Sequence, residues 1–267
     1  MAESIDVHKV FAEYFKGCEA LAYALSEKLS EGNICFDYED YLDSPDLQES
    51  NPFFKSKELF MNELMNEEFI SHDGGELKPF IILNRKAYLQ RYFRYETEII
   101  ESIKRLKDNL RIITGGPGSG KTYSVSTRLV SILEENISLK VALAAPTGKA
   151  AFRMTEAIRE FIEKSGNSIR SEIRDKITAL KAETIHRLLK TKPGSVFFRH
   201  DEKNKLPFDV VVIDECSMVD GALMAKLLSA VDDRTKLFLI GDKDQLASVE
   251  AGSVFGDICR AGNGWRS

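Results

Sequence analysis

Residues 115–122 read Gly115-Gly116-Pro117-Gly118-Ser119-Gly120-Lys121-Thr122. They match the phosphate-loop pattern G-x-x-x-x-G-K-[ST]. The apolar segment 110–114 before the loop predicts a buried strand, and apolar residues at helical spacing over 122–133 predict a helix after it. A phosphate loop requires this order of strand, loop and helix, so the sequence predicts a nucleoside triphosphate site in an α/β fold.

The residue types of this loop indicate how it binds. Glycines let backbone N–H groups turn inward at a helix N-terminus, where the helix dipole favours phosphate. We expect Lys121 to reach the β- and γ-phosphates and the Thr122 hydroxyl to hold Mg²⁺. All eight residues of 115–122 are therefore candidate nucleotide-binding residues, and a Gly-rich turn without a ligand is the alternative interpretation of the loop taken alone.

Composition restricts the class of protein. A chain of 267 residues with 43% hydrophobic and 30% charged residues predicts one large or two modest globular domains. The sequence shows neither a basic-then-apolar leader nor an apolar run of membrane-spanning length, which predicts a cytoplasmic protein without membrane contact. The four cysteines form no C-x-x-C pair, so neither a zinc site nor a disulfide framework is indicated.

Charge is distributed unevenly along the chain. Residues 1–100 contain 10 Lys/Arg and 20 Asp/Glu, whereas residues 101–200 contain 19 Lys/Arg and 10 Asp/Glu. The basic segment could supply the phosphate contacts that nucleic-acid binding needs. A nucleotide site also needs local positive charge, so charge alone leaves both interpretations open.

The chain is predicted to contain two domains. For residues 1–97 we expect a small, mainly helical N-terminal domain with helices over 5–30 and 56–69 and strand-like segments over 79–83 and 87–89. For residues 98–267 alternating strands and helices predict a parallel sheet, with residues 164–206 as an insertion. The predicted strands of this second domain are 110–114, 140–145, 209–213 and 236–240.

Polar residues follow two further predicted strands. Asp214 and Glu215 come directly after Val210–Ile213, where we expect Asp214 to hold Mg²⁺ and Glu215 to act as general base toward water. Gln245 follows the strand 236–240 and is placed to sense the γ-phosphate. Each pattern is weak alone, since a polar turn after a strand is common, but their order after the phosphate loop favours the functional interpretation.

A fourth junction of strand and helix follows residues 140–145. Pro146, Thr147, Gly148 and Lys149 offer a hydroxyl, a bare backbone and a cation at a helix start, which suits a nucleic-acid phosphate. The alternative is a simple helix N-cap by Thr147.

Five motifs occur in order, and together they carry a resemblance. They read GGPGSGKT, APTGKAA, TIHRLL, VVIDECS and GDKDQLASVEAGSVFGDI. The segment 79–260 that contains them resembles the superfamily-1 DNA helicases, and most closely the RecD family, the alpha subunits of the bacterial exonuclease V (RecBCD) complex.

The resemblance implies a fold, a reaction and partners. The fold would be a RecA-like P-loop NTPase, and the reaction would be ATP- and Mg²⁺-dependent, 5′-to-3′ translocation on single-stranded DNA during double-strand break repair. Residues 1–97 would dock on the large exonuclease V subunits, and DNA ends would be the substrate. A stand-alone helicase of the same branch, a nucleotide-binding subunit without motor activity and a small-molecule kinase are the alternatives.

The resemblance also implies site residues. Lys121, Asp214, Glu215 and Gln245 would be catalytic, and Thr122 and Asp214 would hold the metal. The implied DNA contacts are Pro146, Thr147, Gly148, Lys149, Thr184, His186 and Arg187. For His186, a packed or capping role on a short helix is an equal alternative.

The sequence departs from the family pattern in two places. Residues 95–110 lack the adenine-contacting glutamine that the family has on a helix before the loop, and Gln90 is predicted to lie in a strand-like aromatic segment. The sequence ends at Ser267, after the third core motif, so the second motor domain and its arginine finger are expected to be absent. From this we expect nucleotide binding with slow hydrolysis and no unwinding by these residues alone.

Overall fold

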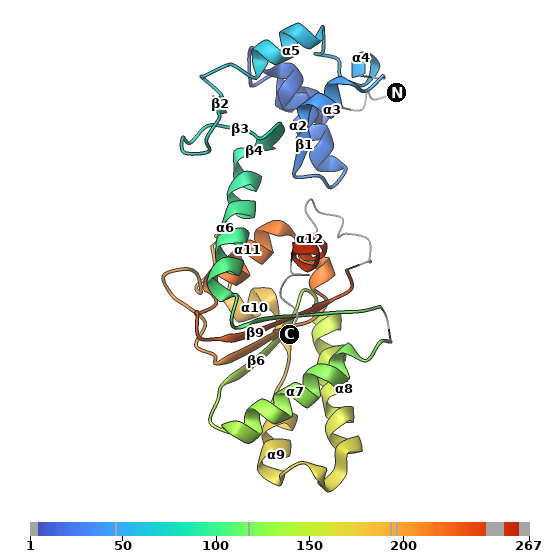
Figure 1. Cartoon of the computed structure of the whole chain (residues 1–267), viewed down its shortest axis with the longest axis vertical. Helices are drawn as coiled ribbons and strands as arrows, with labels where there is room; N and C mark the ends of the chain where they lie inside the picture. Colours follow the sequence, from blue (N-terminus) through green and yellow to red (C-terminus); the bar gives the residue numbers. More distant parts are fainter. Residues whose placement is uncertain are drawn as a thin grey trace. The chain divides into compact units, whose positions relative to one another are not determined.

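The computed structural model describes residues 5–45, 47–116, 118–192, 194–195, 197–243 and 254–261 (Figure 1). The chain divides into two compact units, the first ending at Thr97 and the second beginning at Glu98. Helix α6 (Gln90–Leu106) contains this boundary. None of the helices in the described part of the chain is long and apolar enough to cross a membrane.

The first unit combines short helices with a small sheet. Its strands lie in the order β1-β4-β3-β2, and β2 pairs with β3 in parallel while the other pairs are antiparallel. A two-residue turn, Asn84-Arg85, joins β3 to β4 with φ of 49° and 66°, as a tight hairpin requires. The helices are α1 (Val7–Ala12), α2 (Glu19–Ser30), α3 (Tyr38–Leu42), α4 (Leu47–Ser50) and α5 (Lys57–Glu63), and the strands are β1 (Cys35–Asp37), β2 (Ile70–Ser71), β3 (Phe80–Leu83) and β4 (Lys86–Leu89).

The prediction of one helix over residues 5–30 is wrong. The segment forms α1 and α2, separated by a turn in which Gly17 has φ of +83°, a conformation that interrupts a right-handed helix. The start of α2 is stabilised from elsewhere in the chain, because the Glu63 carboxylate accepts hydrogen bonds from the N–H groups of Ala20 (3.4 Å) and Leu21 (2.9 Å). Burial raises the pKa of Glu63, and these two bonds oppose the rise.

The predicted helix over 56–69 is shorter than expected and ends at Glu63. Ser56 caps its start by accepting a hydrogen bond from the Leu59 N–H at 3.2 Å. Beyond its end, the Asn66 side chain accepts a bond from the Glu68 N–H at 3.0 Å, a local turn that competes with a continued helix.

The second unit is a parallel α/β domain. Its five strands lie in the order β5-β9-β8-β6-β7, and every pair is parallel. This confirms the predicted RecA-like fold, in which one strand, β9, separates the phosphate-loop strand β5 from β8. The strands are β5 (Leu110–Thr114), β6 (Val141–Ala145), β7 (Glu183–Thr184), β8 (Val210–Ile213) and β9 (Lys236–Gly241).

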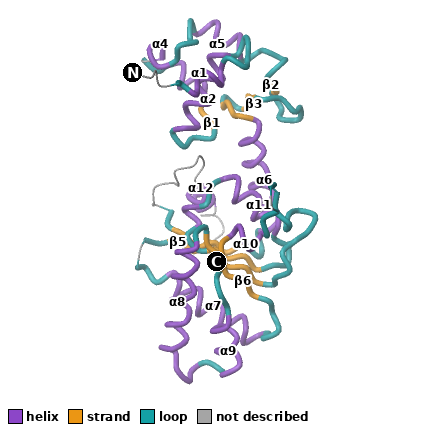
Figure 2. The backbone as a smooth tube through the Cα atoms, turned by 180° about the vertical axis from the view of Figure 1, so that it is seen from behind, coloured by secondary structure: helices purple, strands orange, loops and turns teal. Residues whose placement is uncertain are grey.

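Helices cover both faces of this sheet. Figures 1 and 2 show α7, α8 and α9 on one side of it and α10, α11 and α12 on the other. The first face buries Val125 and Leu129 of α7 and Met154 of α8 against Val212 and Ile240. Burial on both faces explains why the central strands β6, β8 and β9 are continuous apolar runs. The prediction that residues 110–114 form a buried strand is wrong in one respect: they form β5, but β5 lies at an edge of the described sheet and none of its residues is fully buried. The helices are α7 (Lys121–Glu135), α8 (Gly148–Ser165), α9 (Ser171–Ala179), α10 (Ile185–Leu189), α11 (Gly221–Ala230) and α12 (Val254–Ala261).

The segment 164–206, which we predicted to be an insertion between core strands, is partly integrated into the domain. Ile173 and Ile177 of α9 are buried in the core beneath α7 and α8. The next element, β7, pairs with β6 and forms the edge of the sheet, with Thr184 opposite Ala145.

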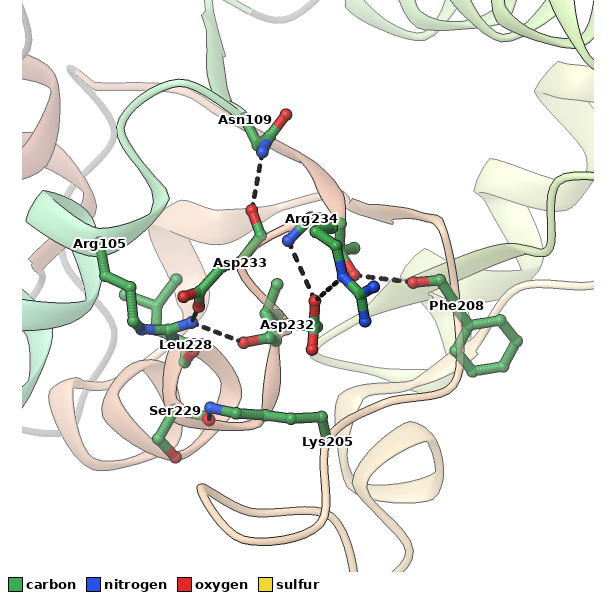
Figure 3. A network of polar contacts seen from close by, with 11 residues as sticks. Arg105, Asn109, Lys205, Phe208, Leu228, Ser229, Asp232, Asp233 and Arg234 are labelled. Carbon is green, nitrogen blue, oxygen red and sulfur yellow. Dashed lines mark hydrogen bonds and ion pairs between the residues drawn. The ribbon is translucent and has the colours of Figure 1, made fainter.

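A cluster of polar contacts fastens the end of α6 to the end of α11 (Figure 3). The Arg105 guanidinium donates to the carbonyl oxygens of Leu228 (2.9 Å) and Val231 (3.0 Å), and it pairs with Asp233. The ammonium of Lys205 donates to the Ser229 carbonyl at 2.6 Å. Two cations therefore donate to carbonyl groups at the C-terminal end of α11, where the helix dipole favours positive charge.

We predict that Arg105→Ala lowers the free energy of unfolding by about 1–3 kcal/mol, because carbonyl groups of α11 lose a charged donor. Urea unfolding followed by circular dichroism measures this loss. Arg153→Ala is the matched control, since Arg153 is exposed on α8 and its removal should change stability by less than about 0.5 kcal/mol. Equal effects of the two substitutions would contradict the role of Arg105.

Candidate nucleotide and nucleic-acid site

The carboxyl ends of the parallel strands bring the predicted motifs to one edge of the sheet. Asp214 follows β8, and its N–H donates to the Ala144 carbonyl of β6 at 2.9 Å. On the other side of β9, the Gly115 N–H donates to the Gly241 carbonyl at 3.3 Å, and the Lys243 N–H donates to the Thr114 hydroxyl at 3.4 Å. The phosphate loop and the residues after β8 and β9 therefore start from adjoining positions, as parallel strands require.

The phosphate loop has the backbone conformation that its glycines allow. Gly118 and Gly120 have φ of +73° and +79°, in the left-handed region. Gly120 is the N-cap of α7, and because it has no side chain it leaves the first N–H groups of that helix open toward an anion. Gly115 packs closely against the loop, since a Cβ there would lie 2.6 Å from the Ser119 hydroxyl oxygen and would force that side chain to rotate.

Lys121 lies folded against this loop. Its ammonium donates to the Gly116 carbonyl at 3.0 Å and to the Gly115 carbonyl. These bonds hold the positive charge beside the glycines, at the first residue of α7. The charge and the helix N-terminus together form a site that suits a polyphosphate.

Asp214 and Glu215 form the acidic part of the site. One Asp214 carboxylate oxygen accepts a hydrogen bond from the Glu215 N–H at 2.8 Å. Burial raises the pKa of Asp214, and the nearby Glu215 charge adds to this, while the bond from the Glu215 N–H and the charge of Lys121 oppose it. A carboxylate that is poorly solvated and close to a lysine fits a divalent cation bound to phosphate.

Glu215 has an uncommon backbone conformation. Its φ of 54° and ψ of 40° place it in the left-handed region, which costs a residue other than glycine about 1–2 kcal/mol. The turn directs the chain from β8 into a short 3₁₀ helix, Cys216–Met218, whose Cys216 is buried. Strain of this kind is concentrated at functional sites, which supports the general-base role predicted for Glu215.

Some predicted residues are outside the described part of the chain. The candidate γ-phosphate sensor Gln245 and the loop residue Pro117 belong to this group. The backbone of Thr122 lies in α7, but its side chain is also outside the description. The described groups that fit Mg²⁺ and a triphosphate are therefore Lys121, Asp214, Glu215 and the backbone of the loop.

The predicted DNA-contacting residues start two helices. Thr147 caps α8, and its hydroxyl accepts a hydrogen bond from the Ala150 N–H at 3.2 Å. Thr184 caps α10 in the same way, by accepting a bond from the Arg187 N–H at 3.3 Å. The capping alternative given for Thr147 is thus correct, and Thr184 is an N-cap that the sequence analysis did not predict. It leaves their exposed neighbours, such as Lys149, open to solvent.

These two helix starts border the same groove. Gly148, Thr184 and Arg187 line a depression of about 380 Å³ on the surface of the second unit. His186 is exposed and its ring packs edge-on against Phe198, with the ring centroids 5.7 Å apart. The sequence did not predict that the two candidate segments would share a groove.

The prediction that Gln90 lies in a strand-like segment is wrong. Gln90 is the first residue of α6, the helix that precedes the phosphate-loop strand, and its N–H donates to the Pro79 carbonyl at 2.8 Å. Gln90 directly follows the strand β4, and the aromatic residues Tyr88, Tyr92 and Phe93 on either side of it are of types common in strands. A helical glutamine therefore does precede the loop, although not within 95–110.

Comparison with known proteins supports the predicted family. Residues 97–251 match the model of the AAA_19 family, an AAA domain. The RecBCD enzyme subunit RecD of Mycolicibacterium smegmatis is 34% identical over 303 aligned positions, which cover 96% of this chain and 52% of the relative. The RecBCD enzyme subunit RecD of Mycobacterium tuberculosis H37Rv is 47% identical over 159 positions, covering 57% of this chain and 27% of the relative.

A third relative has a different name. The ATP-dependent RecD2 DNA helicase of Deinococcus radiodurans is 41% identical over 143 positions, which cover 54% of this chain and 17% of the relative. The chain spans about half the length of the M. smegmatis relative and smaller shares of the other two. These matches confirm the resemblance to the RecD family.

We predict that Gly241→Ala destabilises the sheet edge at the site. A Cβ at residue 241 would lie 2.6 Å from the Phe255 ring, so α12 or β9 would have to shift. We expect a loss of about 1–3 kcal/mol in unfolding free energy, as for other overpacked positions. Gly148→Ala is the control because no atom lies within 4 Å of its added Cβ. If both variants unfold at the same urea concentration as the parent chain, the close packing of Phe255 on β9 is wrong.

Proposed function

The chain belongs to the AAA_19 family of AAA domains, and we propose that it is part of an ATP-dependent DNA helicase subunit of a RecBCD-type exonuclease. In this proposal residues 98–267 form the first RecA-like motor domain. They couple ATP hydrolysis to 5′-to-3′ movement along single-stranded DNA during double-strand break repair, with DNA ends as the substrate. The direction and the pathway rest on the resemblance to the RecD family.

One observation carries the proposal. The phosphate loop with Lys121 and the acidic pair Asp214-Glu215 follow β5 and β8, two strands separated only by β9. The same unit carries a groove lined by Gly148 and Arg187 from the two candidate DNA segments. A protein that uses ATP to move along DNA needs both kinds of site in one domain.

Each residue of the site would have a separate role in ATP hydrolysis. Bound Mg²⁺ would neutralise phosphate charge, and Asp214 and Thr122 would hold it there. Lys121 would leave the Gly115 and Gly116 carbonyls and donate to phosphate oxygens, which are stronger acceptors because they are charged. Glu215 would accept the proton of the attacking water, and Gln245 would sense the γ-phosphate.

The match to the M. smegmatis RecD subunit favours a complex over a stand-alone enzyme. That match covers 96% of this chain, and therefore most of residues 1–97, whereas the match to the D. radiodurans RecD2 helicase covers 54%. The acidic composition of residues 1–100 also suits a protein-docking surface better than a DNA-binding one. We therefore propose that residues 1–97 dock on the large subunits of the exonuclease.

Two substitutions test the hydrolytic site. Lys121→Ala should weaken Mg²⁺-ATP binding by about 10- to 100-fold, since one charged hydrogen-bonding group is lost. Glu215→Gln should keep the affinity but slow hydrolysis by at least about 100-fold, because the general base is lost. Isothermal titration measures the affinity, and single-turnover hydrolysis with protein in excess measures the rate.

Lys140→Ala is the control for both substitutions. Lys140 is an exposed lysine at the amino end of β6, whereas the site lies at the carboxyl ends of the strands. Its loss should change neither the ATP affinity nor the rate of hydrolysis. Unchanged ATP affinity in Lys121→Ala would place the nucleotide elsewhere. If Glu215→Gln hydrolyses ATP at the rate of the parent chain, Glu215 is not the general base.

A further inference from the structure

A groove on the second unit joins an aromatic side chain to a set of cations. We call it the α8–α10 groove; it has a volume of about 380 Å³. One wall comes from α8 and the other from residues 181–187, which contain β7 and the start of α10. The residues that matter here are Gly148, Phe152, Arg159, Lys181, Thr184 and Arg187.

Phe152 is exposed although it lies on a helix with a well-buried face. Its relative exposure is 66%, whereas Met154 and Ile158 of the same helix are each 2% exposed. Lys149, Phe152, Glu156 and Arg159 are spaced by three and four residues, so they form one stripe along α8. An aromatic ring within a charged stripe has no role in the core and offers a face for stacking.

The walls of the groove are held in place by hydrogen bonds. The buried Thr155 hydroxyl donates to the Ala151 carbonyl at 3.0 Å and accepts a bond from the Ala182 N–H at 3.0 Å. This side chain ties the chain entering β7 directly to α8. Thr184 fixes the start of α10 through its capping bond to Arg187. The backbone segments that carry the ring and the cations are therefore fixed relative to one another before any ligand binds.

The charges of the groove favour an anion. Lys181 and Arg187 are exposed, and within the described ranges neither side chain has an ion-pair partner. Of the acidic residues that line the groove, Glu156 pairs with Arg159 at 3.2 Å, and Glu183 is half-buried. The cations without an ion-pair partner in the described ranges, Lys181 and Arg187, thus lie on the wall formed by residues 181–187, across from Phe152.

We propose that the α8–α10 groove binds a nucleotide of single-stranded DNA, with its base stacked on Phe152 and a neighbouring phosphate held by Lys181 and Arg187. An aromatic face beside backbone-contacting cations is the combination that single-strand binders use, because every base has a stacking face. This inference rests on the proposed DNA-dependent function and adds Phe152 and Lys181 to the candidate contacts.

The test compares two oligonucleotides that differ only in their bases. Fluorescence anisotropy gives the affinity of the full chain for a labelled oligo-dT and for the same strand with abasic sites. Phe152→Ala should weaken binding to oligo-dT by about 5- to 100-fold, the loss expected for one stacked base. It should leave binding to the abasic strand unchanged, and Phe152→Trp should retain binding to both.

Tyr14→Ala is the matched control, since Tyr14 is an aromatic residue of the first unit with 77% exposure. Its affinity for both strands should equal that of the parent chain. Lys181→Ala should weaken both strands alike and reduce the slope of log affinity against log salt by about 1, as for one lost phosphate contact.

The outcomes separate the two proposals. If the parent chain binds no single-stranded DNA, the proposed function fails together with this inference. If the parent chain binds and Phe152→Ala binds oligo-dT equally well, or loses affinity for both strands alike, the stacking role of Phe152 is wrong while the proposed function stands. Tighter binding to oligo-U than to oligo-dT would overturn the assignment of DNA as the occupant.

Discussion

Parallel pairing of β5, β9, β8 and β6 determines where every element of the candidate site in the second unit begins. The register places Thr114 beside Gly241 and Ile213 beside Leu239, so the phosphate loop and the acidic pair leave the sheet at the same edge. A shift of one residue in either pairing would turn alternate side chains to the opposite face. The apolar packing of α7 and α8 on Val212 and Ile240 holds the register in place.

Charged residues of the site are held in energetically unfavourable environments, and the stability of the rest of the domain compensates for this. Asp214 is buried enough to raise the pKa of its carboxyl group, and Glu215 adopts a strained left-handed conformation. Lys121 turns its ammonium toward neutral carbonyl oxygens of the loop. A triphosphate with a divalent cation would give each of these charges a better partner, which explains why a stable fold keeps them close together.

Local sequence signals predicted the centre of the second unit well. The strands 110–114 and 210–213 and the helix after the loop were expected because apolar β-branched runs and helical spacing are local properties. The short strand β7 was missed because its two residues become a strand only by pairing with β6. The break between α1 and α2 was missed because it depends on Gly17 and on the distant Glu63 carboxylate. The groove beside Phe152 was also unexpected, since its walls come from separate parts of the chain.

We propose that one domain couples a nucleotide site to a single-stranded DNA site. The most direct measurement is the affinity for Mg²⁺-ATP with and without a saturating single-stranded oligonucleotide, together with the DNA affinity with and without ATP. Coupling requires both affinities to change by the same factor, about 5- to 150-fold for typical coupled sites. We expect this reciprocal change, and we expect it to disappear in Lys121→Ala. ATP binding that depends on Lys121 but is identical with and without DNA would contradict it.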